Sequence, residues 1–270
     1  MTLAVVWYRE KFGQLWCAAD SRISGKSGVL TDSGPKIFPI PVNCYEPIKP
    51  PNFRVRKRHS FGFAYAGSTL SAMSTHSIAS TCTQNLLYKR GSELPVSIES
   101  IAELYKAVAQ KQVIEMSSRI GALDSLQTYL FDCLVFGYCP RYEVYKAYLL
   151  KQSVDFEGFQ IEIIEFITAP GNYLPIGSGE KGFVRLMDEL KGHPEAGVLT
   201  TLKEMVGREM QADVGGYLQI GCSDKKGFKI IPIMNTAAEP SKAYISFLGM
   251  DATSDVVIDG FTIGYSAIKP

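Results

Sequence analysis

The sequence predicts an α+β fold in which two antiparallel sheets pack face to face between two pairs of helices, as a four-layer αββα sandwich. Runs rich in β-branched residues alternate with helical patterns in the order strands, helix pair, strands, helix pair, strands. Paired helices between strand runs are typical of helices that cover the outer faces of stacked sheets. The 270 residues are 46% hydrophobic and 20% charged, which indicates a sizeable core. We expect one domain over 1–270, with an insert at about 41–60 and a C-terminal appendage from about 236.

The first half of the chain predicts a hairpin, an edge insert and two helices. The turn REKFGQ joins the first two apolar runs into a hairpin. A further strand, FGFAYAG, ends at Gly67, and Ser97 is a suitable N-cap for the second helix. The expected elements are strands at Leu3–Tyr8, Leu15–Asp20, Lys36–Ile40 and Phe61–Gly67, and helices at Ser68–Arg90 and Ile98–Ile120.

The second half repeats this alternation. Three strands precede a Gly-Ser-Gly turn at 177–179, two helices follow that turn, and a hairpin follows the helices. The expected elements are strands at Thr128–Tyr138, Tyr142–Leu150 and Phe159–Thr168, helices at Glu180–Lys191 and Gly197–Gln211, a hairpin of Tyr217–Cys222 with Phe228–Ile233, and strand-like pieces at Tyr244–Phe247 and Val256–Tyr265.

Composition excludes several classes of function. The net charge of +1 gives no reason to expect a nucleic acid or a membrane as partner. No apolar run reaches transmembrane length, and the first run lacks the basic flank of a signal peptide, so we expect a cytoplasmic protein. The six scattered cysteines form no CxxC pair and are expected to be reduced and mostly buried.

Histidine, metal and nucleotide chemistry find little support. The chain has three histidines, His59, His76 and His193, and no spacing among them favours a Ser-His-Asp triad, so we expect each at the surface. No HExxH, Walker A or GxGxxG sequence is present. We therefore expect no metal and no cofactor.

A second kind of catalysis fits the start of the chain, where Thr2 directly precedes a buried strand. An N-terminal threonine carries its own base, because its free α-amine, with a pKa of about 7.7–8.0, lies within reach of its own hydroxyl. A buried lysine beside that hydroxyl favours its deprotonation, and such a lysine needs a carboxylate partner. A glycine N–H, which no side chain screens, can stabilise an oxyanion.

Five short motifs carry a resemblance to a known family. They are TLAVV at 2–6, AADSR at 18–22, KIFPI at 36–40, AYAGS at 64–68 and IGSG at 176–179. In this order they resemble the proteasome β-subunit superfamily of N-terminal nucleophile (Ntn) hydrolases, including its bacterial ring-forming members. The resemblance covers roughly 2–40 and 61–235, and it implies that family's αββα Ntn-hydrolase fold.

The resemblance also implies roles for individual residues. Thr2 would be the nucleophile after removal of Met1, and Asp20 and Lys36 the paired acid and base that tune it. The Gly67 amide would stabilise the oxyanion, and Ser178 would bind near the Thr2 amine. Two residues would support the site. They are Arg22 and Asp213, the latter in QADVGGYLQI, where Val214 stands at the serine position of the family pattern.

Three functions are compatible with this pattern. The first is a threonine peptidase that cleaves peptides or unfolded proteins in a homo-oligomeric ring or related assembly, with the involvement of an ATPase left open. The second is an amidase that acts on a small molecule, and the third is a catalytically silent subunit.

The proline-rich insert is the most basic part of the chain. It carries Arg54, Arg56, Lys57 and Arg58 between the strands that bear Lys36 and Gly67. It is either a solvated loop, or a lid or subunit contact that selects carboxylate groups.

Overall fold

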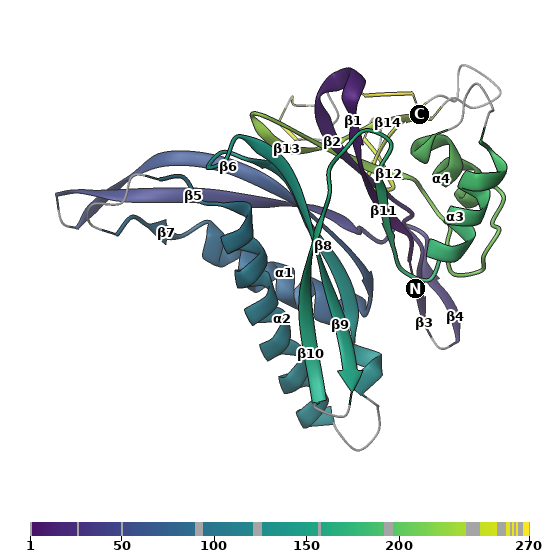
Figure 1. Ribbon diagram of the computed structural model, residues 1–270, viewed down its shortest axis with the longest axis horizontal. Coiled ribbons are helices and arrows are strands. Elements are labelled where there is room, and N and C mark those ends of the chain that lie inside the picture. Colours follow the sequence, from purple (N-terminus) through teal and green to yellow (C-terminus); the bar gives the residue numbers. More distant parts are fainter. Residues whose placement is uncertain are drawn as a thin grey trace.

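The computed structural model contains two large sheets, and the strand that follows Thr2 belongs to the five-stranded one (Figure 1). Its helices are α1 (Thr69–Thr83), α2 (Ile98–Ile120), α3 (Glu180–Glu189) and α4 (Val198–Gly207), and its 3-10 turns are Glu10–Phe12 and Leu126–Tyr129. The structure describes residues 2–25, 27–49, 51–89, 94–120, 126–155, 158–191, 197–235, 244–252, 258–259, 261, 263 and 267–269.

One sheet has five antiparallel strands in the order β11-β1-β2-β12-β13. The predicted first hairpin is confirmed, because β1 pairs with β2 from Ala4 opposite Ala19 to Arg9 opposite Gln14. The bounds are β1 Ala4–Arg9, β2 Gln14–Ala19, β11 Tyr173–Ile176, β12 Gln219–Asp224 and β13 Gly227–Ile231.

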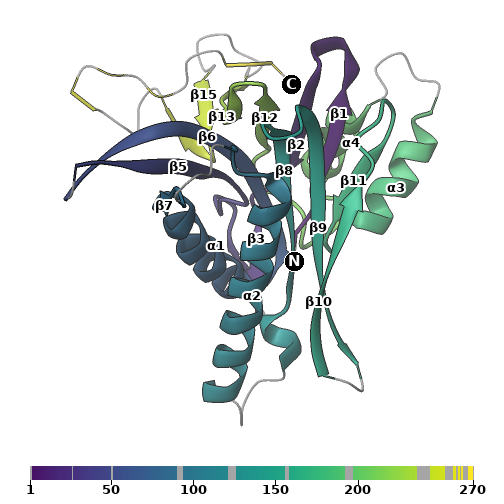
Figure 2. The same cartoon turned by 60° about the vertical axis from the view of Figure 1, so that its left-hand side comes forward.

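The other large sheet has six strands in the order β10-β9-β8-β6-β5-β7. Its strands β5 and β6 form a long hairpin that projects well beyond α1 and α2 (Figures 1 and 2). The bounds are β5 Ile37–Lys49, β6 Asn52–Gly67, β7 Leu86–Leu87, β8 Phe131–Cys139, β9 Val144–Asp155 and β10 Gly158–Phe166.

Two small sheets complete the described strands. β3 (Ile23–Gly25) pairs with β4 (Gly28–Thr31), and a three-stranded sheet has the order β14-β15-β16. Of the expected C-terminal strands, the one at Tyr244–Phe247 is confirmed as β15, and Val256–Tyr265 lies largely outside the described residues. The last bounds are β14 Ile233–Asn235 and β16 Met250–Asp251.

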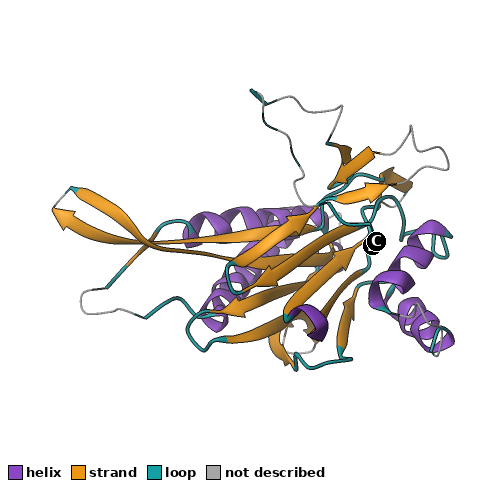
Figure 3. Ribbon diagram, turned by 90° about the horizontal axis from the view of Figure 1, so that it is seen from above, coloured by secondary structure: helices purple, strands orange, loops and turns teal. Residues whose placement is uncertain are grey.

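Alternation along β1 divides the core, because successive side chains of a strand point to opposite faces. Val5 and Trp7 pack with buried residues of α3 and α4, whereas Ala4 and Val6 pack against the other large sheet. The helices α1 and α2 share a separate cluster with the six-stranded sheet. Figure 3 shows the two helix pairs on different sides of the strands.

The predicted four-layer αββα sandwich with two antiparallel sheets is nevertheless wrong for this molecule. The six-stranded sheet is mixed, because β7 runs parallel to β5. The β5–β6 hairpin extends far outside any layer, and the β14–β16 sheet belongs to neither large sheet. These additions arise from the stretch expected as an insert at 41–60 and from the chain after residue 232, which short motifs did not describe.

The sequence prediction ended the fifth strand too early because of its prolines. Pro39, Pro41 and Pro47 lie within β5, which has a second neighbour only at Cys44 and Tyr45. Proline cannot donate a ladder hydrogen bond, and it is tolerated where a strand is open on one side. The proline-rich stretch is therefore a strand that is open on one side over most of its length, rather than a loop.

The cysteines and the helices carry two further findings. All six cysteines are free thiols, and only Cys82 is exposed. No helix in the described part of the chain has the length and apolar character needed to cross a membrane.

Candidate active site

Asp20 is the centre of a buried polar network at the end of β2. Its side chain is fully buried and accepts four hydrogen bonds. One oxygen accepts from Lys36 Nζ at 2.7 Å and from the Leu3 amide at 2.9 Å. The other accepts from the amides of Arg22 at 3.2 Å and Gly215 at 3.0 Å. Four donors fix the orientation of this carboxylate.

Lys36 lies directly before β5, and its side chain is as inaccessible as that of Asp20. Burial lowers the pKa of Lys36, and the charge of Asp20 opposes this shift. Because Asp20 binds both Lys36 Nζ and the Leu3 amide through one oxygen, the ammonium group lies next to the start of β1. The positive charge of Lys36 therefore lies near the Leu3 amide, which directly follows Thr2.

Gln219 fixes the backbone on which Lys36 stands. Its Oε1 accepts from the Lys36 amide, and its Nε2 donates to the Gly34 carbonyl, both at 2.9 Å. The Gln219 side chain is buried, so these bonds form in a low-dielectric environment. Sequence reasoning missed Gln219, and a lone amide in the apolar strand QIGC was the available signal.

Thr2 is buried, with 3% of its surface exposed, and it is held by the turn at 177–179. The Gly179 amide donates to the Thr2 carbonyl at 3.4 Å. Gly177 has φ of +101°, and a Cβ there would lie 2.1 Å from the Thr2 carbonyl oxygen and 2.9 Å from the Cβ of Ala66. Only glycine allows this approach, so the turn, Thr2 and the end of β6 meet at one place.

Gly67 follows Ala66 as the last residue of β6. Its φ is +113°, and a Cβ would lie 2.7 Å from the Leu130 carbonyl oxygen. Glycine is therefore required here by the backbone conformation and by close packing. The residue is exposed, beside the buried end of the strand that contacts the 177–179 turn.

Ser178 and Asp213 form a pair at the open side of this arrangement. Ser178 Oγ donates to Asp213 Oδ2 at 2.6 Å, and the charge of Asp213 acts to raise the pKa of Lys36. Val214, at the expected serine position, is fully buried, and its Cγ2 would lie 3.0 Å from a Cβ on Gly179. The valine therefore packs behind the turn, and the polar partner of Asp213 is Ser178.

Arg22 ties the loop after β2 to the segment before β12. Its Nε binds Asp32 Oδ1 and its Nη2 binds Glu209 Oε1, each at 2.7 Å. Nη1 donates to the Ala212 carbonyl at 3.3 Å. The hydrogen bond to Asp32 is the largest cause of a raised pKa for Arg22. Arg22 thus holds together the segments that surround Asp20, without itself binding the Asp20 carboxylate through its side chain.

The Gly-Gly pair of QADVGGYLQI fits against this arginine and its neighbours. A Cβ on Gly215 would lie 2.5 Å from Arg22 Cζ, and one on Gly216 would lie 2.4 Å from the Asp32 carbonyl oxygen. Sequence reasoning also missed Asp32 and Glu209, because neither lies in a motif of its own.

The structure thus gathers the predicted site residues around the start of β1, although they come from six separate segments. We call them the Thr2 group, and Met1 lies outside the described residues. No cluster of His, Cys, Asp and Glu in the described ranges could hold a metal ion. The members of the Thr2 group are Thr2, Asp20, Arg22, Lys36, Gly67, Ser178 and Asp213.

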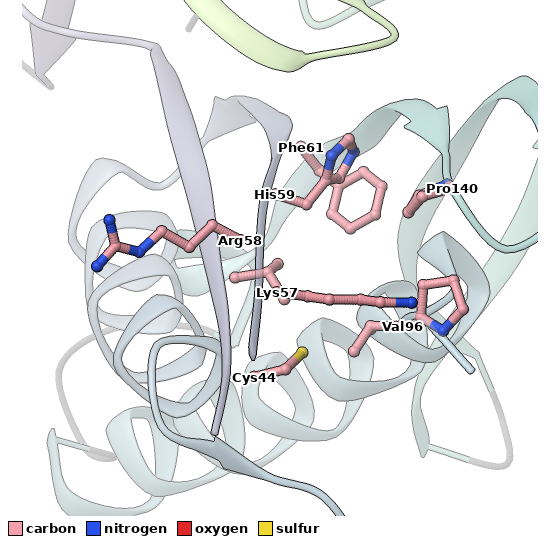
Figure 4. A pocket seen from close by; sticks show the side chains of 9 residues that line it. Cys44, Lys57, Arg58, His59, Phe61, Val96 and Pro140 are labelled. Carbon is pink, nitrogen blue, oxygen red and sulfur yellow. The ribbon is translucent and has the colours of Figure 1, made fainter. Parts of the chain in front are cut away.

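The insert expected at 41–60 does not cover the Thr2 group. From Ile37, β5 runs away from the start of β1, and the hairpin tip lies a whole strand length from Lys36 (Figure 1). The hairpin instead helps to line a pocket of about 300 Å³ with Pro95, Val96 and Pro140 (Figure 4). Arg58 points away from that pocket. A lid over Thr2 is therefore the wrong interpretation of the insert.

The expectation of surface histidines is wrong for His59 and His76, which are both partly buried. His59 Nε2 lies 2.8 Å from the Tyr138 carbonyl oxygen. His76 Nδ1 lies 2.9 Å from the Tyr105 hydroxyl, and burial lowers the pKa of His76 to about 4. His59 packs against Phe61 and His76 against Phe38 and Phe63, so both have structural roles. His193 lies outside the described residues.

Comparisons with known proteins identify the fold. No family model and no curated protein matches the sequence. Among solved structures, Anbu (ancestral beta-subunit) from Yersinia bercovieri has a TM-score of 0.55 at 15% identity, over 85% of this chain and 86% of that one. A helical assembly of the Anbu complex from Pseudomonas aeruginosa has a TM-score of 0.57 at 14% identity, over 89% and 90%. An Anbu mutant from Hyphomicrobium sp. strain MC1 has a TM-score of 0.52 at 15% identity, over 85% of each chain.

These findings correct the family predicted from the motifs. The similar structures are Anbu proteins, which form a distinct proteasome-like family, so the assignment to the proteasome β-subunit superfamily of Ntn hydrolases is wrong. At such low identity the likeness establishes a proteasome-like Anbu fold and nothing finer. Activity has to be argued from the Thr2 group itself.

Proposed function

We propose that this protein is an N-terminal threonine hydrolase that cleaves peptide bonds, with Thr2 as nucleophile once the bond between Met1 and Thr2 has been cut. One observation carries the proposal. A fully buried carboxylate, Asp20, binds the amide that follows Thr2 and the ammonium of a fully buried Lys36 through a single oxygen. A buried ion pair is costly to maintain and is weak evidence for stability, so a role in chemistry accounts better for its presence.

The reaction follows from an amine and a hydroxyl on one residue. The Thr2 amine takes the proton of Oγ1, which attacks the carbonyl carbon of the scissile bond and forms a tetrahedral oxyanion. The amine then gives its proton to the leaving nitrogen as the C–N bond breaks, which leaves an ester on Oγ1. Water, deprotonated by the same amine, attacks the ester carbonyl, and the resulting tetrahedral intermediate releases the carboxylic acid and restores the hydroxyl.

Lys36 and Asp20 have complementary tasks in this scheme. The positive charge of Lys36 favours the developing alkoxide of Thr2, and Asp20 keeps Lys36 in place and opposes the lowering of its pKa by burial. Gly67, exposed at the end of β6, offers an unscreened N–H for the oxyanion. Ser178, held by Asp213, orients the amine. Arg22 is a positioning residue.

Similarity to an assembled protein supports a homo-oligomer. One of the structures similar to this chain is a helical assembly of an Anbu complex. We therefore propose that this chain also assembles with copies of itself, and that peptides or unfolded segments reach Thr2 within the assembly.

The test compares chains with different first residues. A fusion cleaved directly before Thr2 yields a chain that begins with Thr2, and a second preparation retains Met1. Release of a fluorescent amine from peptide amides should require the first form. Thr2→Ala, made the same way, should lower turnover by at least about a thousandfold, whereas Thr2→Ser should keep measurable activity.

The matched control is Thr81→Ala, which removes an exposed threonine hydroxyl on α1 that binds the Ser77 carbonyl. It should leave turnover unchanged. Equal turnover by the Thr2→Ala chain and the unaltered chain would rule out Thr2 as the nucleophile.

A further inference from the structure

A second hollow lies at the opposite end of β1 from Thr2. It has a volume of about 520 Å³, and its walls include Arg9, Trp16, Lys229, Ile231, Ile268 and Lys269. Arg9 ends β1, so at about 3.3 Å per residue the hollow lies on the order of 20 Å from Thr2 along the strand. We call it the Arg9 pocket, and it shares no residue with the Thr2 group.

Backbone hydrogen bonds hold the C-terminal wall of the pocket. The Met234 amide donates to the Ile268 carbonyl at 2.8 Å, and the Ile268 amide donates to the Pro232 carbonyl at 3.0 Å. The wall is thus held by backbone hydrogen bonds as well as by side-chain packing.

The charged side chains that line the Arg9 pocket are all positive. Arg9, Lys229 and Lys269 line it, and no carboxylate does so among the residues that the structure describes. Lys229 forms a loose ion pair with Asp224, in which Nζ lies 3.9 Å from Oδ2. Such a concentration of positive charge favours an anionic ligand.

Arg9 is held ready for such a ligand. Its Cζ lies 4.5 Å from the ring centre of Trp16 and 4.6 Å from that of Phe12. These two cation–π contacts hold the guanidinium near the rings, and its N–H groups can still donate to a ligand. Burial lowers the pKa of Arg9, which reflects partial removal of its charge from water. An oxyanion that accepts two parallel hydrogen bonds would offset that cost.

The rest of the lining is apolar. Trp16, Ile231 and Ile268 provide ring and branched aliphatic surface beside the three cations. A volume of this size lies within the range of small-molecule sites, about 300–1,000 Å³. We propose that the Arg9 pocket binds a small carboxylate with an apolar body, its carboxylate on Arg9 and its apolar part against Trp16 and the two isoleucines.

The test is titration of the full-length protein with decanoate below its micellar range, followed by calorimetry and by tryptophan fluorescence. Decanoate should bind once per chain and change the emission of Trp16. Decanol, which has the same chain and no charge, should bind at least about tenfold more weakly, as expected for loss of a charge-assisted contact. Inorganic phosphate should compete weakly, because it lacks the apolar body.

Variants of the pocket separate charge from shape. Arg9→Gln should weaken decanoate binding about tenfold or more, and Arg9→Lys should restore part of it. The matched control is Lys225→Gln, an exposed lysine at the β12–β13 turn that does not line the pocket, and it should bind like the unaltered protein. Circular dichroism checks that each variant is folded.

Three outcomes would overturn the proposal. They are equal affinity for decanoate and decanol, unchanged binding by a folded Arg9→Gln protein, and no saturable binding at all. None of them bears on peptide hydrolysis at Thr2.

Discussion

Two ion pairs, one at the buried base of the β5–β6 hairpin and one towards its tip, have nearly the same length and very different surroundings. At the buried end, Lys36 Nζ lies 2.7 Å from Asp20 Oδ1, and both side chains are 0% exposed. Towards the tip, Arg54 Nε lies 2.6 Å from Glu46 Oε1, and the two side chains are 67% and 20% exposed. The distances do not distinguish the pairs. Burial does, because water screens one pair and not the other.

The difference shows how one hairpin can serve two purposes. At its buried end a polar pair is retained inside a hydrophobic core, where apolar residues would pack at less cost. At its exposed end the charges keep a projecting edge soluble and discourage pairing with other strands. The predictions below test this contrast, from the largest expected effect to the smallest.

The largest effect is expected from Asp20→Ala. Removal of one partner leaves the Lys36 ammonium buried without its carboxylate, which should lower the free energy of unfolding by about 3–5 kcal/mol. Urea unfolding at neutral pH measures this. In the folded variant the buried Lys36 amine loses its proton at a lower pH than it does in the unfolded chain. The loss of stability should therefore shrink as pH rises. A loss under about 1 kcal/mol would contradict the account of a buried pair.

The second prediction concerns His76, which is partly buried as a neutral group rather than as part of an ion pair. The pKa of His76 is lowered to about 4, so between that value and about 6.5 the unfolded chain binds more protons at this site than the folded chain. Stability should therefore fall as pH falls through this window, by about 2.5 kcal/mol between about pH 7 and pH 4.5. In His76→Gln this part of the fall should disappear from urea titrations. The same fall in both proteins would show that His76 does not titrate in the window.

A smaller loss is expected at Gln219. Gln219→Leu leaves the Lys36 amide and the Gly34 carbonyl without their partner, which should cost about 1–3 kcal/mol. Peptide hydrolysis should fall as well, because the backbone at Lys36 is no longer held in position. Gln160→Leu on the edge strand β10 is the comparison variant, and it should keep turnover. Full turnover by folded Gln219→Leu would show that the two hydrogen bonds of Gln219 are not needed for activity.

The smallest effect is expected at the hairpin tip. Glu46→Ala removes the partner of Arg54 and Arg56, and it should change the free energy of unfolding by less than about 1 kcal/mol. High salt should reduce even this difference. A loss as large as that of Asp20→Ala would mean that exposure does not separate the two pairs.

The sequence indicated Asp20 and Lys36 because each lies in a short motif at the border of an apolar strand. Gln219 and Glu209 could not be found in this way, since their partners Lys36, Gly34 and Arg22 lie nearly two hundred residues away in the sequence. The full length of the β5–β6 hairpin could not be predicted, because β5 contains prolines and prolines normally indicate that a central strand has ended. The single-domain organisation stays a prediction.

The most direct test of the central claim is covalent trapping with a peptide epoxyketone. Such a compound closes a stable six-membered ring only with a residue that offers both a hydroxyl, which adds to the ketone, and a free amine, which opens the epoxide. Intact mass followed by peptide mapping of the chain that begins with Thr2 should show one adduct per chain, located on Thr2, and none on the chain that retains Met1. An adduct on any other residue, or no adduct on a folded chain that begins with Thr2, would contradict the account.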